Sequence, residues 1–172
     1  ERKHIGLFGA LNALALTTLT FYLLTGLFGA RLGEIESFLP PAKESAAVSA
    51  GETGKNGELP WITNDYAAAI AKAKSENKRV FVDYTGYTCT NCRWMEANMF
   101  TKTEVKKELE KFVRVRLYTD GEGEPYQGFQ RMQEQRFGTV ALPLYAIVSS
   151  NDETVATFAG LTRDQNEFIA FL

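Results

Sequence analysis

The stretch FVDYTGYTCTNCRWMEANMF, residues 81–100, decides the fold of this chain. It begins within residues 80–84, an otherwise apolar run that predicts a short buried strand. From Cys89 onward no glycine or proline interrupts the stretch, so we expect a helix to begin there and to continue to about residue 100. The only two cysteines of the chain, Cys89 and Cys92, therefore lie at the start of a helix that closely follows a strand.

A CxxC pair in this position has a specific chemistry. The unpaired backbone N–H groups and the dipole of a helix N-terminus favour the thiolate form of Cys89. Cys92 lies about one helical turn further on, where it can form a disulfide with Cys89 that is made and broken by exchange through a mixed disulfide. We therefore predict that Cys89 is the exposed nucleophile and that Cys92 is the partly covered resolving thiol.

Other roles for the two cysteines stay open at this stage. A zinc site would need a second CxxC or a histidine pair, and the chain has a single histidine, His4. Cu(I) needs only two thiolates, so copper binding is one alternative, and a static structural disulfide is another. The net charge of −2 gives no indication of nucleic-acid binding.

Two carboxylates flank the cysteine pair. Asp83 lies within the predicted strand, where an unpartnered carboxylate would cost several kcal/mol, roughly, so we expect it to have a raised pKa and to exchange a proton with Cys92. Glu96 follows Cys92 by one helical turn and can face the same site. The alternatives are an edge-strand aspartate and a helical glutamate that both face water. Two carboxylates near the thiols would oppose the thiolate form of Cys89.

A proline precedes a later predicted strand in VALPLYAIV, residues 140–148. A trans Pro143 would be an ordinary residue at the start of a strand. A cis Pro143 would instead bend the chain tightly beside the active site. Composition leaves both possibilities open.

The rest of residues 61–172 predicts a small α/β domain. Apolar residues at helical spacing, or residues typical of helix N-caps, predict further helices. Alternation of apolar residues and arginine in residues 113–118 predicts a strand with one face in water. Because helices connect the early strands, these should be parallel, whereas the last two strands should form a hairpin. The result is a mixed central sheet flanked by helices. The predicted helices are 64–77, a segment after residue 101, 126–137 and a last one after residue 165, and the late strands are 144–148 and 154–158.

The N-terminal part of the chain is of a different kind. Residues 5–30 carry no charged side chain, and a bilayer core needs roughly 20 apolar residues, which favours a transmembrane helix within residues 1–32 over a signal peptide or a buried helix. The basic residues before this segment place its N-terminus in the cytoplasm by the positive-inside tendency. Residues 33–60 are small, polar and charged and are predicted to be a flexible linker to the domain 61–172. Since the chain begins with Glu1, we expect it to be part of a longer or processed protein.

These motifs resemble the thioredoxin-like superfamily. Within it, they are most similar to the C-terminal periplasmic domain of DsbD-type thiol:disulfide interchange proteins, which follows a membrane helix. The resemblance is most specific in VFVDYTGYTCTNCRWME, TVALPLYAIV and VATFAGLTRDQNEFIAFL. One departure is Thr88, because most thioredoxin-like domains have tryptophan directly before the first cysteine.

The resemblance implies a thioredoxin fold in which Cys89 attacks and Cys92 resolves. It further implies that Asp83 is the buried acid, that Glu96 is a second acidic modulator and that the bond before proline is cis. This cis bond would be Leu142–Pro143, and the backbone of Leu142 would bind an extended segment of a partner by strand addition.

The function that follows is a membrane-tethered protein-disulfide reductase. Electrons would pass from a membrane-embedded dithiol domain to the CxxC pair and then to periplasmic protein acceptors, with the domain in the periplasm and the anchor in a bacterial inner membrane. No cofactor is implied other than the Cys89–Cys92 disulfide, and neither a metal nor a nucleic acid is expected. Two alternatives remain, an anchored thioredoxin that reduces apocytochrome c thiols during cytochrome c maturation, and a Cu(I) carrier.

Overall fold

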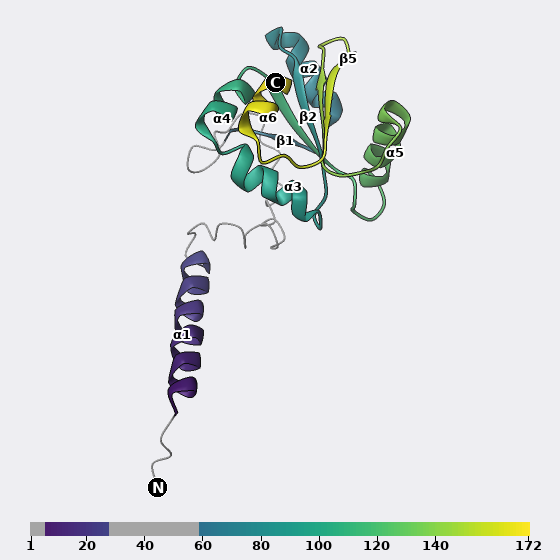
Figure 1. Cartoon of the computed structure of the whole chain (residues 1–172). Helices are drawn as coiled ribbons and strands as arrows, with labels where there is room; N and C mark the ends of the chain where they lie inside the picture. Colours follow the sequence, from purple (N-terminus) through teal and green to yellow (C-terminus); the bar gives the residue numbers. More distant parts are fainter. Residues whose placement is uncertain (1–5, 28–58) are drawn as a thin grey trace. The chain divides into compact units, whose positions relative to one another are not determined.

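A computed structural model describes residues 6–27 and 59–172 of the chain (Figure 1). The chain divides into two compact units, one with the N-terminal helix and one with the globular domain. Most of the linker predicted for residues 33–60 falls outside the described residues, as do the basic residues before the first helix.

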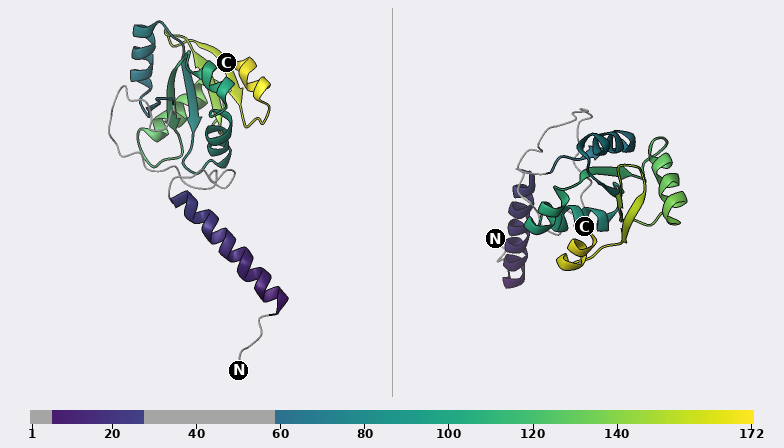
Figure 2. Two further views of the ribbon diagram at one scale, coloured as in Figure 1. Left: turned by 90° about the vertical axis from the view of Figure 1, so that its left-hand side faces the viewer. Right: turned by 90° about the horizontal axis from the view of Figure 1, so that it is seen from above.

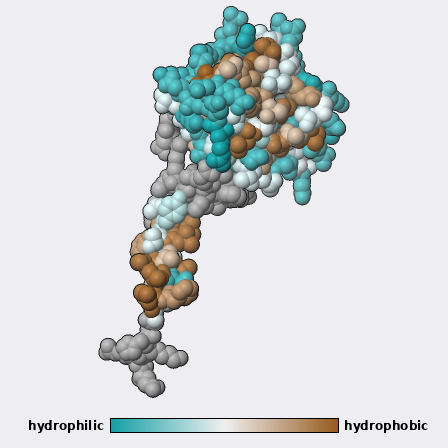
Figure 3. Space-filling view, viewed as in Figure 1, coloured by the Kyte–Doolittle hydropathy of each residue, from teal (hydrophilic) through white to brown (hydrophobic). Residues whose placement is uncertain are grey.

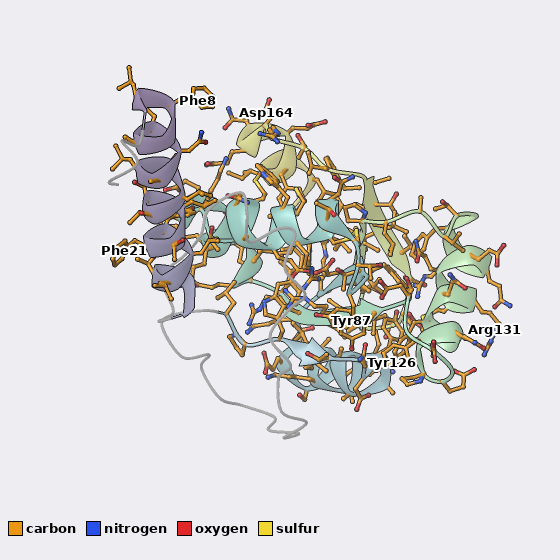
Figure 4. All side chains as sticks on the ribbon, turned by 90° about the horizontal axis from the view of Figure 1, so that it is seen from below. Phe8, Phe21, Tyr87, Tyr126, Arg131 and Asp164 are labelled. Carbon is orange, nitrogen blue, oxygen red and sulfur yellow. A yellow bond between two sulfur atoms is a disulfide. The ribbon has the colours of Figure 1, made fainter. Side chains whose placement is uncertain are left out.

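The first unit contains helix α1, Leu7–Leu27. Its polar side chains bond within the helix: the hydroxyl groups of Thr17 and Thr18 donate to backbone carbonyls one turn earlier, at 2.7 and 2.9 Å. Figure 3 shows apolar side chains along much of its visible surface, and Phe8 and Phe21 project away from the helix in Figure 4. Residues Leu7–Thr25, with a mean hydropathy of 1.7, are long and apolar enough to cross a membrane. The predicted N-terminal apolar helix is therefore present.

The second unit is built on a mixed sheet, as predicted, and this sheet has five strands. The strand order is β1-β3-β2-β4-β5; β1, β3 and β2 are parallel, and β4 and β5 run antiparallel to their neighbours. The predicted hairpin of the last two strands is confirmed, and among the strands of residues 59–172 the two-residue β1 is the one that the sequence did not predict. The strands are β1 Ile62–Thr63, β2 Val80–Thr85, β3 Val113–Tyr118, β4 Leu144–Val148 and β5 Thr154–Ala159.

Helices cover both faces of this sheet (Figures 1 and 2). Helices α2 and α5 contribute to one apolar cluster, and α3, α4 and α6 contribute to the other. The helix predicted to begin at Cys89 changes type, because its α-helical first part is followed by a π-helical segment, η2. The helices are α2 Tyr66–Glu76, α3 Thr90–Trp94, η2 Met95–Met99, α4 Thr103–Leu109, α5 Tyr126–Phe137 and α6 Gln165–Phe171.

Side-chain alternation along β2 divides the core. Val82 and Tyr84 belong to the cluster beneath α2 and α5, whereas Phe81 points to the opposite face. There Phe81 lies among aromatic rings, stacked on Tyr145 at 5.8 Å and edge-on to Phe168 at 6.4 Å. Burial of large aromatic rings contributes strongly to the stability of a core. Asp83 must lie on the same face, since it is two residues after Phe81.

One face of β3 differs from the sequence prediction. The predicted water-facing arginines are covered, because Arg114 donates to the Pro60 carbonyl oxygen at 3.1 Å and Arg116 lies over the Trp61 ring at 4.6 Å. Their side chains lie on the face of the sheet that α3 and α4 cover. The prediction of a solvent-exposed face rested on the alternation of these arginines with Val115. The prediction of one face in water was therefore wrong, because both arginines are half-buried and largely covered.

Candidate active site

The two cysteines lie where strand β2 gives way to helix α3. Cys89 has extended backbone angles, precedes the first helical residue, and its sulfur accepts a hydrogen bond from the Cys92 backbone N–H at 3.2 Å. The two sulfurs form a disulfide, with the Cα atoms 5.3 Å apart. Cys92 is fully buried and Cys89 is half-buried. This is the exposure expected of an attacking and a resolving thiol.

Aromatic side chains border the turn before Cys89. The ring of Tyr87, which is 36% exposed, stacks on the Tyr118 ring with centroids 3.9 Å apart and planes 8° apart. Tyr126 contacts Tyr87 edge-on at 6.0 Å, and both are labelled in Figure 4. Tyr87, two residues before Cys89, thus supplies an aromatic surface next to the CxxC pair, and Thr88 lies directly before the cysteine.

Asp83 is completely buried, and the alternative of an edge-strand aspartate in water is wrong. Strand β2 lies between β3 and β4, and only one carboxylate oxygen of Asp83 has a partner, Arg116 Nε at 3.3 Å. Burial raises the pKa of Asp83 to about 7, and the nearby Glu96 carboxylate acts in the same direction, against the opposing effect of Arg116 and Arg93. The predicted raised pKa therefore agrees with the structure.

Glu96 is largely covered rather than solvated, since its side chain is only 13% exposed. It accepts hydrogen bonds from the Arg93 guanidinium and from the Thr85 hydroxyl, the latter at 3.1 Å. Its carboxylate also lies 3.6 Å from Arg116 Nε, so Glu96 and Asp83 share one guanidinium. The structure therefore brings the two predicted carboxylates together.

The sequence interpretation missed the two arginines that complete this group. We call Asp83, Glu96, Arg93 and Arg116 the buried charge cluster. Arg93 directly follows Cys92 in α3, and its guanidinium donates to the Thr85 hydroxyl at 2.8 Å, so the cluster is joined to the cysteine pair through the helix backbone. Two carboxyl groups and two guanidinium groups lie together here, and contacts between opposite charges offset part of the cost of burying them.

Pro143 lies at the same end of the sheet as the cysteine turn. The antiparallel register pairs Leu144 with Tyr84, so the residue before Leu144 comes beside the end of β2. The Leu142–Pro143 peptide bond is cis, as the resemblance implies, and Pro143 is buried. Leu142 packs against the cluster beneath α2 and α5. Binding of a partner by the Leu142 backbone stays a prediction, as does proton exchange between Asp83 and Cys92.

The arrangement supports two-electron thiol chemistry. A disulfide with one accessible sulfur lies at a helix start, and a buried carboxylic acid with a pKa near neutrality lies on the face of β2 that this helix covers. Within residues 6–27 and 59–172, no three histidine, cysteine, aspartate or glutamate residues are grouped so that they could hold a metal ion.

Solved structures of thiol oxidoreductases have a fold similar to that of this chain. The chain is similar to a thioredoxin from Thermus thermophilus, with 23% identity and a TM-score of 0.53 over 65% of this chain and 82% of the other. It is also similar to the oxidoreductase DsbH, with 14% identity and a TM-score of 0.54 over 72% of this chain and 88% of the other. The reduced DsbD C-terminal domain of Neisseria meningitidis is also similar, with 22% identity and a TM-score of 0.49 over 63% of this chain and 95% of the other. At these identities the likeness concerns the fold alone. None of the curated proteins searched by sequence matches the chain.

A family model described as thioredoxin-like matches residues 61–150, which is more than half of the chain. The match includes strands β1 to β4, the CxxC pair, Asp83, Glu96 and the cis proline. The chain therefore belongs to the thioredoxin-like family and is a disulfide oxidoreductase of that fold, with Cys89 and Cys92 as its redox pair.

Proposed function

We propose that this protein is a membrane-tethered protein-disulfide reductase that relays electrons from a membrane-embedded dithiol to periplasmic protein acceptors. The observation that supports it most is Asp83, a buried acid with a pKa of about 7 on the strand that leads into the CxxC helix. A group with this pKa can both accept and return a proton at neutral pH, which a repeated exchange cycle requires.

The transfer to an acceptor proceeds in two exchange steps. The Cys89 thiolate attacks one sulfur of the acceptor disulfide, which forms a mixed disulfide and releases the other acceptor sulfur as a thiolate. Cys92 then loses its proton to the Asp83 carboxylate and attacks the Cys89 sulfur. The second acceptor thiolate leaves, so the acceptor gains two electrons and Cys89–Cys92 becomes the disulfide seen here.

Recharging the domain is the same chemistry in reverse. A thiolate of the membrane-embedded dithiol attacks the half-buried Cys89 sulfur, and the second donor thiol resolves the mixed disulfide. Cys92 leaves as a thiolate and takes a proton from Asp83. The donor dithiol thereby becomes a disulfide, so no diffusible cofactor is consumed.

Helix α1 gives the tether in this proposal. It is long and apolar enough to span a bilayer, and it precedes the globular unit in the same chain. Anchoring one protein beside another raises the effective concentration of each for the other to about the millimolar range for a short flexible connection. The backbone of Leu142, next to the cis bond, would hold the acceptor by strand addition.

Trapping of the mixed disulfide tests the relay. In full-length Cys92→Ala expressed in bacterial inner membranes, Cys89 should remain linked to its partners, whereas the matched Cys89→Ala variant should trap far fewer. We expect the trapped proteins to include a polytopic membrane protein with paired cysteines and soluble periplasmic proteins. Absence of any trapped membrane donor would contradict the relay.

The same experiment separates the two alternative functions. Apocytochrome c as the sole trapped acceptor would favour a dedicated role in cytochrome c maturation. Stoichiometric copper bound by both thiols of the reduced protein, without disulfide reductase activity, would favour a Cu(I) carrier.

A further inference from the structure

The turn that connects β2 to Cys89 is held by a carboxylate from another strand. Asp120 lies just after β3, and its two oxygens accept hydrogen bonds from the backbone N–H of Tyr87 at 2.8 Å and of Thr88 at 2.9 Å. The Thr88 hydroxyl donates a third bond to the same carboxylate, also at 2.9 Å. Two consecutive residues directly before the attacking cysteine are thus fixed by one side chain.

The backbone around this contact leaves room for the carboxylate. The Thr119 backbone N–H donates to the Thr85 carbonyl at 3.0 Å, which continues the pairing of β2 and β3 and brings Asp120 opposite Gly86. A Cβ atom at Gly86 would lie 2.7 Å from an Asp120 carboxylate oxygen, closer than real Cβ contacts come. Glycine at this position therefore allows the close approach.

The bonding pattern favours an ionised carboxylate at Asp120. Burial would raise its pKa, but the N–H groups of Thr88 and Tyr87 and the Thr88 hydroxyl outweigh burial and hold the pKa below the ordinary value. All three groups donate, and a deprotonated carboxylate accepts on both oxygens more strongly than a protonated acid would.

We infer that Asp120 is a positioning residue for Cys89: it fixes residues 86–88 so that the Cys89 sulfur is held in the direction from which it attacks a disulfide. The backbone N–H of Cys89 donates to the Gly86 carbonyl at 3.3 Å, so the fixed turn runs without interruption to the cysteine. The same turn carries Tyr87, whose ring stacks on Tyr118. The inference rests on thiol–disulfide exchange at this CxxC pair and does not depend on the identity of donor or acceptor.

The reason that positioning matters is geometric. Thiol–disulfide exchange needs three sulfurs nearly in line, and a misplacement of about 1 Å can cost a reaction on the order of 100-fold. Without the three bonds, residues 87 and 88 would lose their backbone link to the chain that follows β3, and the contacts of the Tyr87 side chain would be left to hold the turn. The Cys89 sulfur would then sample directions from which attack is unproductive.

A graded set of variants of the full-length chain in detergent tests the inference. Asp120→Ala removes all three bonds, Asp120→Asn keeps one acceptor oxygen, and Thr88→Val removes only the hydroxyl bond, which Thr88→Ser retains. The matched control is Asp65→Ala, because Asp65 also accepts a backbone N–H, that of Ala68 at 2.8 Å, but at the start of α2.

Two measurements decide the result. The first is the rate constant for reaction of the reduced protein with dithiobis(nitrobenzoic acid), a small disulfide that needs no docking surface. The second is the split between kcat and KM for reduction of insulin disulfides. We expect Asp120→Ala to lower the first rate constant about tenfold or more and to lower kcat with little change in KM. Asp120→Asn and Thr88→Val should be intermediate, and Thr88→Ser should equal the wild type.

The control and the trapping experiment keep the possible failures apart. Asp65→Ala should lower the melting temperature, because it removes the cap at the start of α2, and should leave both rates unchanged. Wild-type rates in Asp120→Ala, or an equal loss in Asp65→Ala, would overturn the inference. The relay itself is judged by the partners trapped in membranes, because the small disulfide reports on Cys89 alone.

Discussion

Replacement of Asp83 by asparagine should remove a pH dependence from the stability of the domain. The Asp83 carboxyl is fully buried, and its pKa rises from an ordinary 3.8 to about 7, mainly through burial and then through the neighbouring Glu96. The folded protein therefore binds one more proton than the unfolded chain between these values. This contribution to stability is fully present below about pH 4 and is lost as the pH rises through about 7.

The size of the effect follows from these values. Single-site linkage gives a change of about 2.5 kcal/mol in the contribution of Asp83 between about pH 5 and pH 8. Asparagine has nearly the shape of the protonated acid and does not titrate. The wild type should therefore lose about 2.5 kcal/mol relative to Asp83→Asn on going from the lower to the higher pH, while titrating groups that do not interact with Asp83 cancel in the comparison.

The tryptophans of the chain make the assay specific. There are two, Trp61 and Trp94, and both contribute to the aromatic face of the globular unit. Urea unfolding of the oxidised full-length protein in detergent, followed by tryptophan fluorescence, therefore reports on that unit at each pH. If the difference in unfolding free energy between wild type and Asp83→Asn stays constant from pH 5 to pH 8, then Asp83 is ionised throughout, paired with Arg116, and the reasoning is refuted.

Three further substitutions test other parts of the structure by the same unfolding assay. Phe168→Ala should cost about 3–5 kcal/mol, because the ring is fully buried among aromatic neighbours, and a loss below about 1 kcal/mol would contradict that packing. Arg116→Gln removes the guanidinium shared by two buried carboxylates and should cost about 3 kcal/mol at pH 8 but less at pH 5; equal losses at both would disagree. Tyr66→Phe removes a hydroxyl that bonds Asp152 and Arg136 and should cost about 1 kcal/mol, with no change in the rate of disulfide exchange; a slower exchange would show that this contact reaches the active site.

The sequence predicted the elements that depend on local pattern. The apolar run 80–84, the following CxxC and the late hairpin define β2, the start of α3 and the strands β4 and β5. Asp83 was predicted to be buried because its strand neighbours are apolar, and the structure agrees. These features could be predicted because strand alternation and helix starts are determined by residues close together in the sequence.

The parts that could not be predicted depend on distant pairing. Arg116 looked solvated in an alternating strand, and only the parallel register that pairs it with Asp83 shows why it is buried. Arg93 reads as an ordinary helical arginine until Glu96 and Thr85 are found beside it. The π-helical segment that carries Glu96 has no signature in its composition. Asp120 lies in a predicted loop, and its role depends on a contact across 32 residues of sequence or more.

The place where the chain enters the globular unit has a practical consequence. Leu59 and Trp61 pack against the aromatic face, Arg114 bonds the Pro60 carbonyl, and the Trp61 ring covers the guanidinium of Arg116. A soluble fragment that begins at residue 62 would leave that guanidinium open to water and weaken its hold on Asp83. The choice of first residue therefore influences the pKa of Asp83, and a fragment intended for redox measurements should include Leu59, Pro60 and Trp61.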